Sequence, residues 1–122
     1  MQYLLLIYQD EAAGAKATDG DKNAMFQAYR EFTAGIVKSG NMRAGDALEP
    51  SSTATTVRVR DGKTLTTDGP YAETREQLGG YYLVEAKDLD EAIKIGARIP
   101  GAHSGAIEVR PVRAMPADYP KA

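Results

Sequence analysis

The sequence of 122 residues predicts a single domain of the α+β class. Apolar runs of strand length begin and end the chain, and two stretches between them repeat apolar residues every three or four positions, as one face of a helix does. The pair Asp61-Gly62 lies between two strand-like segments and indicates a tight hairpin. Helices separated by antiparallel strands are typical of α+β proteins.

Composition excludes several classes of protein. The chain is 43% hydrophobic and 26% charged, which is ordinary for a globular domain. Its net charge is −2 with scattered lysines and arginines, so no nucleic-acid surface is expected. It has no cysteine and one histidine, which fits a reducing compartment. We therefore expect a cytoplasmic protein with no metal site and no cofactor.

The first strand is predicted at residues 2–9, which are apolar on both alternating faces. That pattern is typical of a strand buried on both sides near the centre of a sheet. The run is too short to span a bilayer and is followed at once by Asp10-Glu11, so no membrane association is expected.

A helix follows a small polar stretch at residues 12–19 and ends at Gly40. Asp19 or Asp21 is expected to cap its start, and glycine supplies the left-handed residue that helix ends favour. The predicted inner face of this helix consists of Met25, Phe26, Tyr29, Phe32, Ile36 and Val37.

Three strands are predicted next, at residues 41–48, 54–60 and 63–67. The turn Asp61-Gly62 suits the positive backbone angles of a two-residue hairpin loop. In the strand before it, Val57 and Val59 alternate with Arg58 and Arg60, as in a half-exposed strand.

The last three elements are a strand, a helix and a strand. A strand over residues 80–86 leads to Asp88–Glu91, which forms a capping box with Asp in place of Ser or Thr. The predicted inner face of this second helix is Ala92, Ile93, Gly96, Ala97 and Ile99. Residues 105–112 form the final strand, in which Pro111 indicates an end or an edge.

The order of these elements matches the ferredoxin-like βαββαβ plan with an added β-hairpin. Both helices then lie on one face of the sheet and leave the other face open. We expect a homodimer, formed face to face or through a shared edge, since large exposed apolar surfaces usually mark interfaces.

The strongest functional signal is residues 68–82, DGPYAETREQLGGYY. Turn-forming residues, both charge signs and two glycines occur together just before an apolar strand. Loops that need special backbone angles and also carry charge usually serve function. The segment identifies a site but names no reaction.

Residues 68–76 resemble the motif of the DGPFAETKE family of YCII-related proteins, with Tyr71 replacing Phe and Arg75 replacing Lys. The resemblance continues at residues 3–8, 56–58, 78–82, 89–92 and 108–112. It implies a dimeric α+β barrel in a small bacterial protein. It also implies one YCII-related domain over residues 1–112, with a C-terminal tail at 113–122.

The resemblance implies two kinds of activity. Related YCII proteins use a His-Asp pair as an enzyme-like centre, and other dimeric barrels act as isomerases, lyases or oxygenases. The only histidine here, His103, follows the second helix, so that centre does not transfer to this chain. Members of the family also occur fused or adjacent to extracytoplasmic-function sigma factors, which suggests a regulatory setting.

The two candidate catalytic residues also have structural explanations. Asp68 suits a turn in which Gly69 takes positive φ and Pro70 sets the exit angle, and we favour this role. As a general base, Asp68 would need burial or a nearby carboxylate such as Glu73. His103, expected to be exposed, would act as an acid or base only within hydrogen-bond reach of Asp68 or Glu73.

The predicted ligand-binding residues are Arg58, Tyr71, Glu73, Arg75 and Tyr81. Arg75 could hold a carboxylate or phosphate, and Gly79 and Gly80 would let the backbone approach a ligand closely. The alternative is that Glu73 and Arg75 belong to a solvated charge run.

Two functions remain open on the sequence alone. In the first, a small metabolite, either neutral or anionic, binds in a cleft around residues 68–71. This binding is accompanied, or not, by cofactor-independent isomerase, lyase or hydrolase chemistry. In the second, the chain is a non-catalytic regulatory or protein-docking module associated with sigma-factor signalling.

Overall fold

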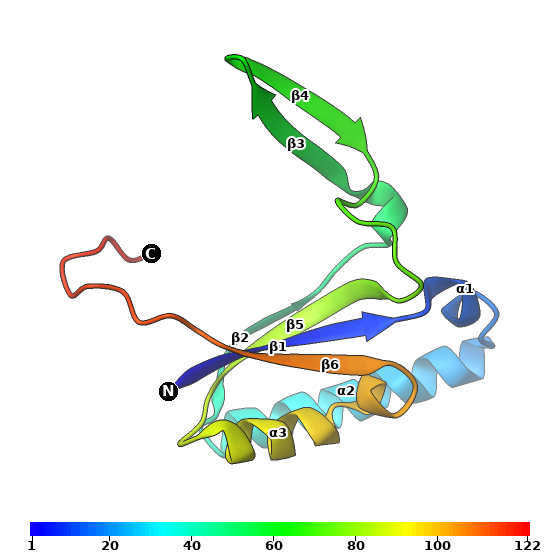
Figure 1. Cartoon of the computed structure of the whole chain (residues 1–122). Helices are drawn as coiled ribbons and strands as arrows, with labels where there is room; N and C mark the ends of the chain where they lie inside the picture. The colour runs from blue at the N-terminus through cyan, green and yellow to red at the C-terminus, as the bar shows by residue number, and fades with distance from the viewer.

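The computed structural model describes residues 1–122 as one antiparallel sheet, two main helices on one face of it, and a separate hairpin (Figure 1). The strands of the sheet lie in the order β2-β5-β1-β6. Their bounds are β1 Gln2–Gln9, β2 Met42–Ala47, β5 Gln77–Glu85 and β6 Ala106–Pro111. The predicted ferredoxin-like α+β fold is confirmed.

Strand β1 is central, as its apolar pattern predicts. It pairs antiparallel with β5 on one side and with β6 on the other. Tyr3, Leu5 and Ile7 are buried on the helix-facing side, whereas Leu4 and Leu6 on the opposite side are only half-buried. Both faces of β1 are thus apolar, but only the face toward the helices is buried within this chain.

The other sheet strands differ slightly from the predicted ranges. Strand β5 begins at Gln77, three residues before the predicted start at residue 80. Ile7 pairs with Gly80 and Tyr8 with Leu78, so Gly79 is passed over in a bulge. Glycine favours bulges. Strand β6 lies at an edge of the sheet and ends at Pro111, as predicted.

Helix α3 (Leu89–Arg98) seals one half of the core. Its buried residues are Ala92, Ile95, Gly96 and, just beyond the helix, Ile99. The prediction was wrong for Ile93 and Ala97, which are exposed, and it missed Ile95. Positions 92, 95, 96 and 99 follow the helical repeat, and residues 93 and 97 fall on the opposite side.

The start of α3 is capped by Asp88, whose carboxylate accepts the N–H of Glu91 at 2.9 Å. The carboxylate of Glu91 accepts the N–H of Lys87 instead of that of Asp88. The predicted capping box is therefore only partly formed, because its second hydrogen bond comes from Lys87, the residue before the N-cap, and not from Asp88 itself.

Helix α2 (Asp19–Lys38) packs tightly only through its C-terminal half. Ile36 is fully buried and Phe32 is half-buried, whereas Phe26 is 65% exposed. Val37, also predicted to face inward, is exposed. The predicted apolar face is therefore correct at Tyr29, Phe32 and Ile36 and wrong at Met25, Phe26 and Val37.

The ends of α2 are set by local hydrogen bonds. Thr18, not Asp19, is the N-cap, and its side chain accepts the N–H of Asp21 while Asp21 accepts that of Thr18. This reciprocal capping box holds the first turn. Gly40 follows the helix with a φ of 81°, as predicted for a left-handed C-terminal residue.

A short helix, α1 (Glu11–Gly14), lies in the segment predicted as a polar stretch. Asp10 caps it by accepting the N–H groups of Ala12 and Ala13. The carboxylate of Glu11 then accepts hydrogen bonds from the backbone N–H and the hydroxyl of Ser51, at 2.8 and 2.6 Å. This links α1 to the 3-10 turn η1 (Ser51–Thr53) at the root of the hairpin.

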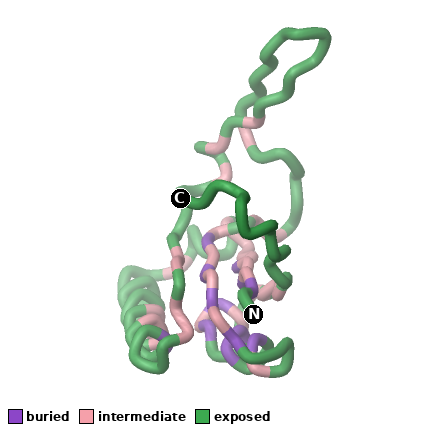
Figure 2. Tube along the Cα trace, turned by 90° about the vertical axis from the view of Figure 1, so that its left-hand side faces the viewer, coloured by how far each residue is buried: buried purple, intermediate pink, exposed green.

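The hairpin of β3 (Thr55–Arg60) and β4 (Lys63–Asp68) projects away from the sheet (Figure 1). Its predicted turn is confirmed, since Asp61 and Gly62 have φ angles of 52° and 73°. The strands pair only with each other, and Figure 2 shows the hairpin exposed along almost its whole length. The expectation of a half-exposed strand was wrong, because Val57 is 60% exposed.

Residues 113–122 form no helix or strand and are exposed throughout. None of the helices combines the length and the apolar character that crossing a membrane requires.

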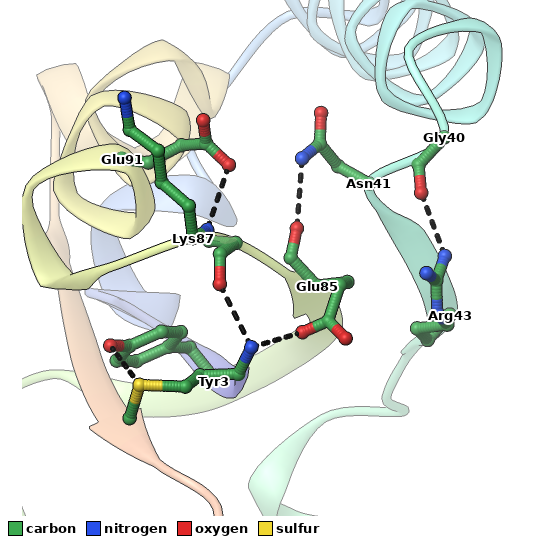
Figure 3. A network of polar contacts seen from close by, with 9 residues as sticks. Tyr3, Gly40, Asn41, Arg43, Glu85, Lys87 and Glu91 are labelled. Carbon is green, nitrogen blue, oxygen red and sulfur yellow. Dashed lines mark hydrogen bonds and ion pairs between the residues drawn. The ribbon is translucent and has the colours of Figure 1, made fainter.

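The N-terminus is held where β5 ends (Figure 3). The amine of Met1 lies 2.7 Å from the carboxylate of Glu85 and donates to the carbonyl oxygen of Ala86 at 3.0 Å. Asn41 adds a hydrogen bond to the carbonyl oxygen of Glu85 at 2.8 Å. The bond from the amine lowers the pKa of the Glu85 carboxyl below its ordinary value of 4.5.

We expect Glu85→Gln to lower the melting temperature slightly at neutral pH, because this exposed ion pair contributes little. The folded-state pKa of Glu85 is lowered, so its contribution is present above the unfolded value and is lost as the pH falls through the folded value. Melting curves of wild type and variant should therefore converge at acidic pH. Glu73→Gln, at an exposed carboxylate, is the control, and a difference independent of pH would contradict this account.

We also expect Gly105→Ala to destabilise the fold by about 1–3 kcal/mol, since overpacking costs that much. A Cβ at residue 105 would overlap the carbonyl oxygen of Tyr8, which is backbone and cannot move aside easily. Gly35 is the matched control, because a Cβ there meets nothing within 4 Å, and Gly35→Ala in α2 should stabilise by about 0.5–1 kcal/mol. Urea unfolding measures both, and equal effects would refute the close approach.

Candidate functional site

A cavity of about 720 Å³ lies between the N-terminal half of α2, helix α1 and the sheet. It forms where α2 does not close onto β2 and β5. Its apolar wall is made by Ile7, Met25, Phe26, Tyr29, Met42 and Tyr82. The volume is within the range of small-molecule sites, which is about 300–1,000 Å³.

The ring of Tyr82 lies over the backbone of β2 in the wall of the cavity. A Cβ at Gly45 would come within 2.8 Å of this ring, so glycine is what lets the tyrosine lie there. Phe32 packs edge-on against the same ring, with the centroids 5.2 Å apart and the planes at 71°. The hydroxyls of Tyr82 and Thr33 are 2.6 Å apart, which joins α2 to β5.

A second phenol, that of Tyr29, lies one helical turn before Thr33. Its oxygen accepts the backbone N–H of Gly101 at 3.2 Å and the side-chain amide of Gln9 at 3.4 Å. Burial raises the pKa of Tyr29 above its ordinary value of 10.0, so the phenol is neutral at physiological pH. The inner part of the cavity therefore carries neutral hydroxyls and no charge.

Charged residues also line the cavity. They are Asp10, Asp21, Lys22 and Asp46. The hydroxyl of Tyr81 donates to the carboxylate of Asp46 at 2.7 Å, and this bond raises the pKa of Tyr81. No group of three or more His, Cys, Asp or Glu side chains is arranged to hold a metal ion.

Three of the residues singled out by sequence line this cavity. They are Gly79, Gly80 and Tyr81, all on β5. Tyr81 and Tyr82 belong to opposite faces of the strand, as predicted, and Tyr82 is the one in the core.

The turn residues of the motif lie at the root of the hairpin, outside the cavity. Gly69 has a φ of 102° and its N–H donates to the carbonyl oxygen of Ala54 at 2.7 Å, which closes the base of the hairpin. Pro70 follows as the exit. The side chain of Asp68 is exposed and makes no hydrogen bond, so it does not cap the turn.

The charged residues of the motif do not converge. Tyr71 is 80% exposed and lies under the guanidinium of Arg58 at 5.4 Å. Glu73 and Arg75 are exposed, and neither side chain forms an ion pair. None of residues 68–76 lines the cavity.

His103 lies in η2 (Pro100–His103), beside α2 and Arg98 in a separate depression. The hairpin that carries Asp68 is on the other side of the sheet (Figure 1). The structure does not bring His103 to Asp68 or Glu73, because η2 belongs to the helix layer and the hairpin leaves the opposite side.

Sequence reasoning missed most of the polar groups in the cavity. Tyr29 and Thr33 are four residues apart on the apolar face of α2. This spacing alone predicts that their hydroxyls lie on the same side of the helix. Gln9 and Gly101 carry no local signal, because only the fold brings them to Tyr29.

Residues 1–116 match the YCII-related domain. An uncharacterised protein of Rhizobium meliloti (strain 1021), R00369, is 32% identical over 114 residues, which is 92% of each chain. With this coverage, on a small ferredoxin-like α+β fold, the chain belongs to the YCII-related family.

We expect Asp46→Asn to bring the pKa of Tyr81 back toward its ordinary value of 10.0, because the carboxylate that accepts its proton is gone. Titration of protein labelled with ¹³C at the tyrosine ring, followed by NMR, would resolve this group. Asp118→Asn in the C-terminal segment is the control. An unchanged Tyr81 titration in Asp46→Asn would contradict the bond between the two side chains.

Proposed function

We propose that this YCII-related protein binds a small, largely apolar organic molecule in the cavity between α2 and the sheet. The observation that carries the proposal is the cavity itself, with about 720 Å³ of space walled by rings and a few hydroxyls. Apolar walls with a small number of placed polar groups are typical of sites for small ligands.

The proposed site is next to the DGPY segment in sequence but not in it. Residues 68–76 lead directly into β5, whose Gly79 to Tyr82 line the cavity. The motif, which also supports membership of the DGPFAETKE branch, would set the path of the chain between hairpin and sheet. Absence of cysteine supports a cytoplasmic setting.

Binding, and not turnover, is the function that the geometry supports. No histidine lines the cavity, and its carboxylates belong to Asp10, Asp21 and Asp46, none of which is buried. Burial is one of the conditions that raise the pKa of a carboxyl toward neutrality, and none of these carboxylates meets it.

A thermal-shift screen of neutral aromatic and alicyclic compounds, with carboxylates and phosphates beside them, should identify ligands that raise the melting temperature. The shift should disappear in Ala13→Trp, because Ala13 lines the cavity from α1 and is exposed enough to accept a large ring. Ala34→Trp, on an exposed position of α2 outside the cavity, is the matched control. Equal shifts in both variants would place the ligand elsewhere.

We also propose that the chain forms a homodimer. The open face of the sheet carries Leu4, Leu6 and Leu83, which are only half-buried in the single chain. The hairpin adds Val57 and Val59 on one face, both well exposed. Burying such residues between copies would remove apolar area from water.

A non-catalytic docking role in sigma-factor signalling is the second candidate, and the hairpin favours it. Arg58, Arg60 and Lys63 share one exposed face of this projecting element, which suits an acidic protein partner.

Sedimentation equilibrium at micromolar concentration tests the homodimer. We expect a dimer for the wild type, and a shift toward monomer for Val57→Lys/Val59→Lys, because charges would replace the apolar face of the hairpin. Arg58→Gln/Arg60→Gln on the opposite face of β3 is the control and should leave the dimer intact. A monomeric wild type would contradict the homodimer and leave the hairpin free for another partner.

A further inference from the structure

The hydroxyl of Tyr29 has an unused proton. A phenol oxygen has two lone pairs and one proton. Both lone pairs are occupied, by the N–H of Gly101 at 3.2 Å and the amide of Gln9 at 3.4 Å. No group of the chain accepts the proton, and Tyr29 lines the cavity. The half-buried hydroxyl can therefore donate this proton to a ligand oxygen.

The backbone is shaped around this phenol. A Cβ at Gly101 would lie 2.5 Å from the oxygen of Tyr29 and 2.5 Å from the amide nitrogen of Gln9. Gly101 itself is buried. The absence of a side chain at this position therefore allows two donors to reach one oxygen, which leaves the phenol to act as a donor itself.

A second free proton lies one helical turn further along α2. Thr33 and Tyr82 bring two hydroxyl protons to a single hydrogen bond of 2.6 Å, and no other acceptor is bonded to either group. One of the two protons is therefore unused. Residues four apart on a helix lie on the same face, so Tyr29 and Thr33 point their hydroxyls along one wall.

We infer that the molecule bound in the cavity is neutral and offers a carbonyl oxygen, as in a ketone, aldehyde, ester or amide, to the hydroxyl of Tyr29. This inference rests on the proposed binding function. Neutral donors on an apolar wall suit an oxygen acceptor. The carboxylates of Asp10 and Asp21 outnumber the one cation, Lys22, so the site disfavours an anion.

Three probes of the same size separate these features. Acetophenone carries the carbonyl, α-methylstyrene replaces its oxygen by a methylene group, and benzoate adds a negative charge. Titration into ¹⁵N-labelled protein, followed by amide shifts that include Gly101, detects weak binding and locates it. We expect acetophenone to bind about five- to tenfold more tightly than α-methylstyrene, which is the effect of one hydrogen bond. Benzoate should bind more weakly than acetophenone.

The Tyr29→Phe variant removes only the hydroxyl. It should weaken acetophenone by the same five- to tenfold factor and leave α-methylstyrene unchanged. Tyr119→Phe, in the C-terminal segment, is the matched control and should change neither probe. The amide spectrum of each variant reports whether it is folded, and the comparison of probes on the wild type holds even if Tyr29→Phe is not.

The outcomes separate this inference from the proposal beneath it. If acetophenone and α-methylstyrene bind the cavity equally, the carbonyl inference is overturned, the phenol proton being held by the amide oxygen of Gln9, and the binding site stands. If benzoate binds most tightly, the neutral ligand is overturned. If no probe shifts the amides around the cavity, the proposed binding site fails, and the inference fails with it.

Discussion

The contact between Tyr82 and α2 decides the shape of this molecule. The tyrosine ring lies over Gly45, meets Phe32 edge-on and joins its hydroxyl to Thr33 at 2.6 Å. These contacts fasten the middle of α2 to the sheet. Toward the N-terminus of α2, β5 has Gly80, which carries no side chain, so the helix and the sheet leave a half-open cavity between them.

This arrangement also determines the chemical character of the cavity. Its inner hydroxyls belong to Tyr29, Thr33 and Tyr82, and each is hydrogen-bonded to a neighbouring element. Neutral hydroxyls can be buried at modest cost, provided that they are hydrogen-bonded. The charged groups are on residues that remain partly or fully exposed. An apolar interior with few donors is therefore the stable solution here.

The hairpin follows a different physical rule from the rest of the chain. Its turn and ladder are satisfied locally, and its base is closed by Gly69 and Ala54, so it needs no contact with the sheet to keep its hydrogen bonds. An isolated two-stranded hairpin is only marginally stable in water. Exposed valines on such an element are consistent with an additional surface that packs against it.

The sequence by itself determined the elements whose signals are local. The apolar run at residues 2–9, the turn at Asp61-Gly62 and the helix end at Gly40 all follow from short-range sterics and alternation. It also marked residues of β5 that line the candidate site. Only the tertiary structure decided that Phe26 is exposed, that His103 and Asp68 are kept apart, and that Gly101 meets Tyr29. Those outcomes depend on how α2 leans on the sheet and on contacts between residues 72 positions apart, which no local pattern encodes.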